Sequence, residues 1–156
     1  MKNRLRVNGS DKIRNTMKQI LNFGVVGVGY FGRNYVRLLA KIKGVRLLAV
    51  SRVSKKYEKE VSPLLKEEVQ IYKEPAELFQ DPKVDCVVIA VPTVFHFELA
   101  KRALEAGKHV LLEKPMTRTL DEAKLLQRVV EKSGCIFMLG HQYIYNDYIN
   151  RLKGEL

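Results

Sequence analysis

LNFGVVGVGYFG, residues 21–32, is the stretch that decides the fold of this chain. The short apolar run Leu21–Val26 predicts a strand, and Gly27–Gly32 predicts a tight turn. Apolar residues at helical spacing then follow from Phe31 to Ile42. The three glycines match the G-x-G-x-x-G fingerprint in the strand–turn–helix context that this fingerprint requires. The stretch therefore predicts a dinucleotide-binding unit, with a plain strand–helix turn as the alternative.

Each glycine of the turn has its own expected role. Gly27 permits the tight turn, and Gly29 lets the backbone approach a pyrophosphate with no side chain between them. Gly32 lets the helix pack closely on the strand. The N-terminus of that helix then offers free N–H groups and a positive dipole end to the phosphates.

Strand and helix patterns alternate through the rest of the chain. Further strands are expected at 45–50, 68–72, 84–91, 109–112 and 135–139, with helical segments between them. Gly44, Gly107 and Gly134 mark three helix-to-strand connections. This alternation predicts an α/β fold in one domain: a doubly wound, mainly parallel sheet with helices on both faces, which is the Rossmann fold.

Composition narrows the possible partners. The 156 residues correspond to about one domain, and no apolar run approaches the ~18 residues that a membrane span needs. Cys86 and Cys135 lie in apolar, strand-like runs. We therefore expect two buried thiols in a reducing, cytoplasmic compartment, with no disulfide and no metal site. No membrane partner is expected.

The net charge of +11 raises nucleic acid as an alternative partner, since the first 18 residues carry six basic side chains and one acidic side chain. No aromatic residues interleave with these charges, so nucleic acid is not expected to bind. We interpret residues 1–16 as a disordered basic tail and Met17 as a plausible start of translation. Residues 17–145 are expected to form the dinucleotide-binding domain, and 146–156 a further amphipathic segment.

Ligands of an open α/β sheet lie at the carboxyl ends of its strands, so the residues there are candidate site residues. Ser51 and Arg52 follow the second expected strand, and Arg52 lies twenty residues beyond Gly32. An NAD-binding fold commonly has an acid at this position for the ribose 2′-hydroxyl. An arginine pairs instead with a 2′-phosphate, which favours NADP(H) over NAD(H). A plain surface arginine, or one stacked on adenine, is the alternative.

Three further strand ends carry polar side chains. His96 follows the fourth strand and is able to hydrogen-bond ribose or phosphate, although a lone helical histidine is more often structural. Glu113 and Lys114 follow the fifth strand, where the lysine is suited to accept a proton or to anchor a hydroxyl. A surface ion pair is the alternative interpretation of these two. After the sixth strand come hydrogen-bonding side chains aimed at the same edge: His141, Gln142, Tyr143 and Tyr145.

Together these segments resemble the Gfo/Idh/MocA family of NAD(P)-dependent oxidoreductases, over roughly residues 19–152. The motifs that carry the resemblance are GVGYFG at 27–32, AVPTVFH at 90–96, ALEAGKHVLLEKP at 103–115, LDEAKLL at 120–126 and GHQYIYND at 140–147. The resemblance implies a dehydrogenase or reductase whose substrate is a sugar or a nucleotide-activated sugar. Lys114 matches the family lysine that touches substrate and nicotinamide, and it is the predicted catalytic residue.

The full set of site residues combines these arguments. The cofactor is expected to contact Gly27, Gly29, Tyr30, Phe31, Gly32, Ser51, Arg52, Ala90, Val91, Pro92, Thr93, His96, Glu113, Lys114 and Gln142. The substrate is expected to contact Lys114, Tyr143 and Tyr145.

Members of this family run to well over twice this length and carry a second α/β domain that supplies most of the substrate pocket. The resemblance therefore implies that the chain is the cofactor-binding half of such an enzyme, with residues 146–156 leading toward the second domain. The alternative is a catalytically incomplete dinucleotide-binding module that is truncated or needs a partner chain. An exposed apolar stripe at Tyr148, Ile149 and Leu152 would favour self-association.

Overall fold

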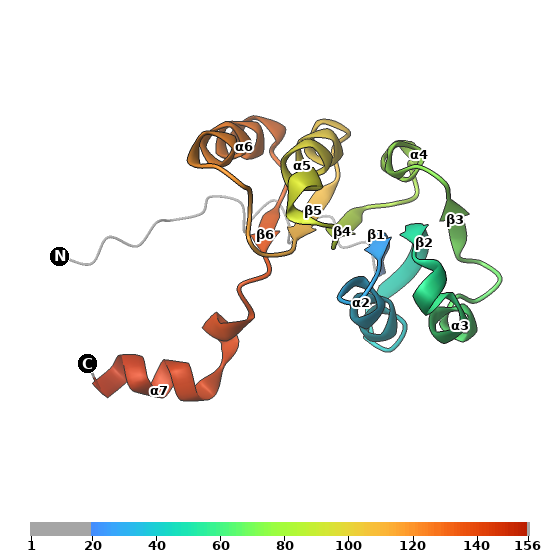
Figure 1. Ribbon diagram of the computed structural model, residues 1–156, viewed down its shortest axis with the longest axis horizontal. Coiled ribbons are helices and arrows are strands. Elements are labelled where there is room, and N and C mark those ends of the chain that lie inside the picture. Colours follow the sequence, from blue (N-terminus) through green and yellow to red (C-terminus); the bar gives the residue numbers. More distant parts are fainter. Residues whose placement is uncertain (1–19, 156) are drawn as a thin grey trace.

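A six-stranded parallel sheet forms the centre of the molecule, in the order β3-β2-β1-β4-β5-β6 (Figure 1). The computed structural model describes residues 20–155, so the expectations for the basic tail and for Met17 lie outside the described residues. The strands are β1 (Leu21–Val28), β2 (Val45–Val53), β3 (Gln70–Tyr72), β4 (Cys86–Ile89), β5 (His109–Leu112) and β6 (Phe137–Leu139). The predicted parallel α/β fold is confirmed.

Helices connect successive strands. They are α2 (Gly32–Leu39), α3 (Glu58–Val61), α4 (Pro75–Gln80), α5 (His96–Glu105), α6 (Leu120–Ser133) and α7 (Asp147–Glu155). Short 3₁₀ turns are η1 (Lys55–Tyr57), η2 (Ser62–Leu64), η3 (Thr93–Phe95) and η4 (Gln142–Tyr145). Glycines 44, 107 and 134 all adopt positive φ just before a strand, as their positions in the sequence predicted.

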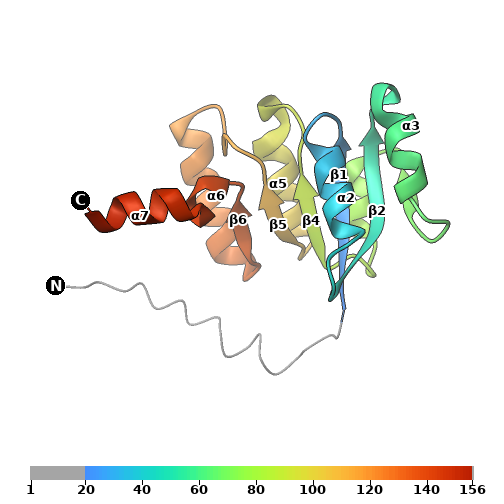
Figure 2. The same cartoon turned by 90° about the horizontal axis from the view of Figure 1, so that it is seen from below.

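Two hydrophobic cores lie on opposite faces of the sheet. α4, α5 and α6 cover one face, and α2 and α3 cover the other, as Figure 2 also shows from below. Side chains of β4 alternate between the faces: Val87 and Ile89 belong to the first core, whereas Val88 belongs to the second. Apolar residues on both faces explain why the central strands read as nearly continuous apolar runs. Because the central strands present apolar side chains on both faces, both faces of the sheet need to be covered by helices.

The strand order reverses between β1 and β4, which lie side by side in parallel register. The first three strands run outward from β1 in one direction, and β4, β5 and β6 run outward in the other. In a sheet of this kind the crevice at the carboxyl ends of the two central strands is the usual ligand site. The fold therefore places the glycine turn at that crevice.

Some elements differ from the sequence-based expectation. β1 and β2 continue to Val28 and Val53, so Ser51 and Arg52 are the last part of β2 and do not follow it. The β2 extension is paired with β1 up to Val28–Val53. Hydrogen bonding to a central neighbour thus carries β2 past the point where its apolar pattern ends.

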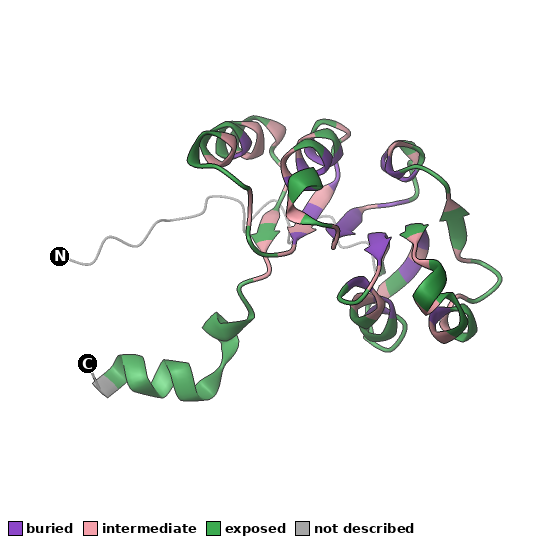
Figure 3. Ribbon diagram, in the orientation of Figure 1, coloured by how far each residue is buried: buried purple, intermediate pink, exposed green. Residues whose placement is uncertain are grey.

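The segment after β6 stands apart from the sheet. Residues 141–154 are all exposed, and Figures 1 and 3 show α7 away from the layers that form the core. Large apolar side chains remain in water there, including Tyr148 and Leu152. Among residues 20–155, no helix is long and apolar enough to cross a membrane, and no group of three or more possible metal ligands is found. Cys86 is buried and Cys135 is half-buried.

Candidate functional site

The glycine turn packs directly on the end of β4. Gly27 has φ +89°, and a Cβ there would lie 2.6 Å from the Ala90 carbonyl oxygen and from the Val91 side chain. A Cβ on Gly32 would lie 1.9 Å from the carbonyl oxygen of Gly27. No larger residue fits either position without moving backbone, so these two glycines are explained by the fold alone.

Gly29 is different, because no atom lies within 4 Å of the position its Cβ would take. Packing does not require a glycine here. The open space borders the first turn of α2, where the Arg33 N–H donates to the Gly29 carbonyl at 3.1 Å. Room beside a helix N-terminus is what a pyrophosphate needs. The geometry thus agrees with a phosphate-binding role for this part of the turn.

Aromatic and basic side chains hold the outer side of the turn. The Arg33 guanidinium lies 5.0 Å from the ring centre of Tyr30 and 4.5 Å from that of Tyr57 on η1. It also donates to Glu60 at 2.6 Å, and Arg37 pairs with the same carboxylate. This cluster connects the glycine turn to the segment after β2. It was not predicted, because its members lie up to 30 residues apart in the sequence.

Arg52 lies at the carboxyl end of β2 in a strained conformation. Its φ of +54° is uncommon for a residue with a side chain, and among the described non-glycine residues it alone has a positive φ. The Arg52 Nη2 lies 3.6 Å from the Glu74 carboxylate, and the guanidinium lies 5.5 Å from the ring centre of Phe95. Strain of this kind concentrates at functional sites. Glu74, between β3 and α4, and Phe95, in η3 after β4, were not predicted as site residues.

Ser51 precedes Arg52 and is fully buried. Its hydroxyl has no hydrogen-bond partner among the described residues. A buried hydroxyl without a partner costs about 1–3 kcal/mol, so a fold that keeps one calls for an explanation. This hydroxyl is closed to solvent, so a ligand at the end of β2 would reach it only if neighbouring groups moved.

His96 begins α5, and its ring is only 1% exposed. Its Nδ1 lies 2.7 Å from the Pro115 carbonyl oxygen, and its Nε2 lies 2.9 Å from that of Val91. Both ring nitrogens are therefore occupied by backbone of the loops after β4 and β5. This geometry favours a positioning role, in place of the expected hydrogen bond from His96 to ribose or phosphate.

Lys114 reaches from the end of β5 to the glycine turn. Its Nζ lies 5.4 Å from the ring centre of Phe31, although the two residues are 83 positions apart in the sequence. Phe31 in turn packs edge-to-face with Tyr30, at 5.3 Å between ring centres. The predicted catalytic lysine and the predicted phosphate-binding turn thus lie side by side at the crevice.

Glu113 does not pair with the Lys114 ammonium in this structure. Its Oε1 accepts a hydrogen bond from the Tyr35 hydroxyl at 2.5 Å, and its Oε2 accepts from the Lys114 backbone N–H at 3.1 Å. Tyr35 belongs to α2, and its spacing in the sequence indicated only a core position. The surface ion pair that the sequence left open as an alternative is therefore absent.

A cavity of about 480 Å³ opens beside Lys114. Its lining comes from the loop after β5 and from the segment after β6: Lys114, Pro115, Gly140, His141, Gln142, Tyr143 and Ile144. The structure thus brings Gln142 and Tyr143 to the candidate catalytic lysine, as expected. Tyr145 is 64% exposed and does not line the cavity.

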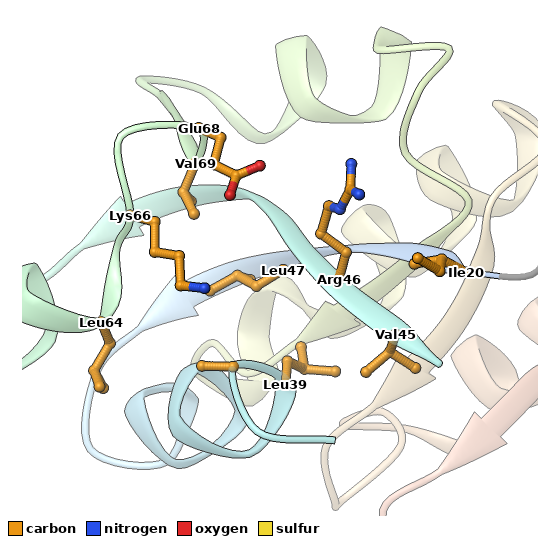
Figure 4. Close-up of a pocket in the computed structure, with 10 residues that line it drawn as sticks. Ile20, Leu39, Val45, Arg46, Leu47, Leu64, Lys66, Glu68 and Val69 are labelled. Carbon is orange, nitrogen blue, oxygen red and sulfur yellow. The ribbon is translucent and has the colours of Figure 1, made fainter. Parts of the chain in front are cut away.

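A second hollow, of about 290 Å³, lies at the opposite edge of the sheet (Figure 4). It is bordered by Val45, Arg46 and Leu47 at the start of β2, by the end of α2, and by the loop before β3. None of the predicted site residues lines it. Of these two hollows, the one beside Lys114 is lined by predicted site residues and the one in Figure 4 is not.

The residues at the carboxyl edge of the sheet fit a nicotinamide dinucleotide. Open space at Gly29 suits the pyrophosphate, and the exposed charge of Arg52 at the end of β2 suits the substituent of a ribose. Lys114 lies beside the same turn, with its Nζ 5.4 Å from the ring centre of Phe31.

Comparison with known proteins gives the same result. Residues 21–141 match the family model described as an oxidoreductase family with an NAD-binding Rossmann fold. The uncharacterized oxidoreductase YdgJ of Escherichia coli is 35% identical over 141 residues, which cover 90% of this chain and 40% of YdgJ. The NAD(+)-dependent scyllo-inositol 2-dehydrogenase of Bacillus subtilis is 30% identical, over 80% of this chain and 36% of that enzyme.

A solved structure agrees in fold. The scyllo-inositol dehydrogenase of Lactobacillus casei, with bound NAD(H) and scyllo-inositol, aligns with a TM-score of 0.76 and 27% identity. The alignment covers 87% of this chain and 41% of that one. This chain thus spans about two-fifths of the length of the relatives that it matches. It belongs to the Gfo/Idh/MocA oxidoreductase family, as that family's NAD-binding Rossmann domain.

Proposed function

We propose that this chain is the cofactor-binding part of an NAD(P)-dependent dehydrogenase or reductase that acts on a sugar or a sugar-like polyol. The observation that carries the proposal is the position of Lys114 Nζ, 5.4 Å from the ring centre of Phe31 in the glycine turn. Residues 17–145 would form the dinucleotide-binding domain, and 146–156 the start of a connection to a substrate domain. The inositol dehydrogenases among the relatives support a polyhydroxylated substrate.

The bound cofactor would supply the hydride acceptor or donor of the reaction. Gly29 and the first turn of α2 would hold the pyrophosphate, and the end of β2 at Ser51 and Arg52 would lie beside the adenosine ribose, with the Arg52 side chain in contact with it. Lys114 would donate a hydrogen bond to the reacting hydroxyl and orient it toward the cofactor, with Tyr143 alongside. Gln142 would contact the cofactor at the same edge.

Catalysis also needs the substrate to be held in a near-attack geometry. Lys114 and Tyr143 are exposed on this chain, and the 480 Å³ cavity is open. We therefore propose that further protein covers this edge in the active enzyme. A second candidate function, a dinucleotide-binding module without turnover of its own, is favoured by the same open edge.

We propose that NADP(H) binds more tightly than NAD(H), because the Arg52 guanidinium is suited to a 2′-phosphate. The expected difference is about 1–3 kcal/mol, which corresponds to roughly 5- to 150-fold in affinity. Arg52→Asp should reverse the preference. Glu74→Gln should widen it, because the Glu74 carboxylate, 3.6 Å from Arg52, competes with the phosphate.

Isothermal titration calorimetry with NADPH and NADH tests both the binding and the preference. Glu68→Gln, at the opposite edge of the sheet, is the matched control and should bind as the wild type does. Tighter binding of NADH by the wild type would refute the preference. The absence of binding of either dinucleotide would refute the proposed function.

We also propose that the chain self-associates through the apolar side of α7. Tyr148 is 76% exposed and Leu152 is 56% exposed, and such a stripe favours association. Sedimentation velocity should show mass that rises with concentration, and the double variant Tyr148→Ser, Leu152→Ser should lower it. Leu120→Ser, which removes an exposed leucine from α6, is the control. A wild type that stays monomeric across the concentration range would contradict this expectation.

A further inference from the structure

The segment Glu113–Pro115 is contacted by polar side chains from helices on both faces of the sheet. On one side Tyr35, from α2, donates to the Glu113 carboxylate at 2.5 Å. On the other side His96, from α5, contacts the Pro115 carbonyl at 2.7 Å. Lys114 lies between the two anchor points. The segment is therefore held by side chains that the predicted cofactor and substrate roles do not explain.

The Glu113 carboxylate also binds the backbone of Lys114, so a carboxylate fixed by Tyr35 restrains Lys114 as well. One oxygen accepts from Tyr35, and the other accepts from the Lys114 backbone N–H at 3.1 Å. With both oxygens engaged, the carboxylate is kept away from the Lys114 ammonium, which lies over Phe31. Hydrogen bonds to an ionised carboxylate are stronger than those between neutral groups. The bond from Tyr35 is thus able to fix the carboxylate.

Tyr35 is also suited to remain a donor. Burial raises the pKa of its hydroxyl well above the ordinary value, and the hydrogen bond to Glu113 and the negative charge of that carboxylate raise this pKa further. The hydroxyl therefore keeps its proton throughout the neutral and mildly alkaline range. Its role as a donor does not depend on pH there.

We propose that Tyr35 is a positioning residue, whose hydroxyl holds Glu113 so that the backbone of Lys114 is fixed and its ammonium stays free for the substrate hydroxyl. This inference rests on the proposed function only for the role of Lys114. Removal of the hydroxyl would release one carboxylate oxygen. The freed carboxylate would then turn to the adjacent ammonium and compete with the substrate for it.

The test compares Tyr35→Phe with Tyr72→Phe in the 156-residue chain. Both variants remove a hydroxyl that donates to a carboxylate, since Tyr72 donates to Asp81 at 3.1 Å away from the site. Hydrogen exchange followed by NMR reports on the Lys114 amide, and competitive acylation with mass spectrometry reports on its Nζ. In Tyr35→Phe the amide should exchange about tenfold faster, and Lys114 labelling should fall about threefold. Tyr72→Phe should change neither.

A double variant separates positioning from a general loss of structure. Adding Glu113→Gln to Tyr35→Phe removes the competing charge, so Lys114 labelling should return to the wild-type level. A labelling defect that persists in the double variant, or an unchanged Lys114 amide in Tyr35→Phe, would overturn the proposal. If Tyr35→Phe does not fold, Glu113→Gln alone should speed exchange at the Lys114 amide, and an unchanged rate would overturn it. NADPH affinity, measured on the same samples, tests the proposed function separately.

Discussion

A Gly29→Val variant is expected to fold as the wild type does and to lose NAD(P)H affinity by about 100-fold or more. Apart from the adjoining residues, no atom lies within 4 Å of the Cβ position at Gly29, so the Cβ of the valine has room in the free chain. A pyrophosphate at the turn would meet it directly. Loss of one or two charge-assisted hydrogen bonds, at about 1.5–3 kcal/mol each, gives an effect of this size.

Gly32→Ala is the contrasting variant for this experiment. Its Cβ would lie 1.9 Å from the Gly27 carbonyl, so it should lower thermal stability before it affects any ligand. Calorimetry and thermal unfolding of both variants measure the two effects. Equal affinity of Gly29→Val and the wild type would show that the phosphates do not approach the turn.

Lys114→Ala is expected to reduce turnover by about 10²- to 10⁴-fold, the usual contribution of a positioned acid–base group. The assay uses a chimera in which this chain replaces the matched part of the Bacillus subtilis scyllo-inositol 2-dehydrogenase, with scyllo-inositol and NAD(P)⁺ as substrates. Lys41→Ala, an exposed lysine beyond the end of α2, is the control and should leave turnover unchanged. Near-normal turnover by Lys114→Ala would show that Lys114 is not a catalytic residue.

The same assay, applied to the 156-residue chain alone, tests whether this chain turns over substrate or only binds the cofactor. We expect it to bind the cofactor without measurable turnover, because the cavity beside Lys114 is open. Robust NAD(P)H production by this chain would show that copies of it build a complete site.

The fold could be predicted from the sequence because each strand, turn and helix is specified by residues that are close together in the chain. The alternation of Val87, Val88 and Ile89 between two cores, and the glycines that the backbone crowds, are properties of neighbouring residues. The carboxyl edge was predictable for the same reason, since each candidate follows or ends a strand. The arrangement of Lys114 and the glycine turn at one crevice then results from parallel strands alone.

Contacts between distant elements could not be predicted in this way. Tyr35 has the spacing of a core residue, and only the structure shows its hydroxyl on Glu113, 78 positions away. Glu74 is an ordinary acidic residue in the sequence, yet it pairs with Arg52. His96 was assigned to the cofactor from its place after a strand, whereas its ring is buried between two backbone carbonyls. Each of these contacts depends on the direction in which a side chain points, and the periodicity of the sequence does not determine that direction.

The central claim is that the dinucleotide occupies the crevice at the carboxyl edge between β1 and β4. Backbone NMR of the wild-type chain during titration with NADPH tests it most directly. Binding at this crevice should shift or broaden the amide signals of Gly29 and Arg52 and those around Lys114, and should leave the signals of Arg46 and Val69, in the hollow of Figure 4, unchanged. An unperturbed spectrum, or changes confined to residues of the hollow in Figure 4, would show that the dinucleotide does not bind at this crevice.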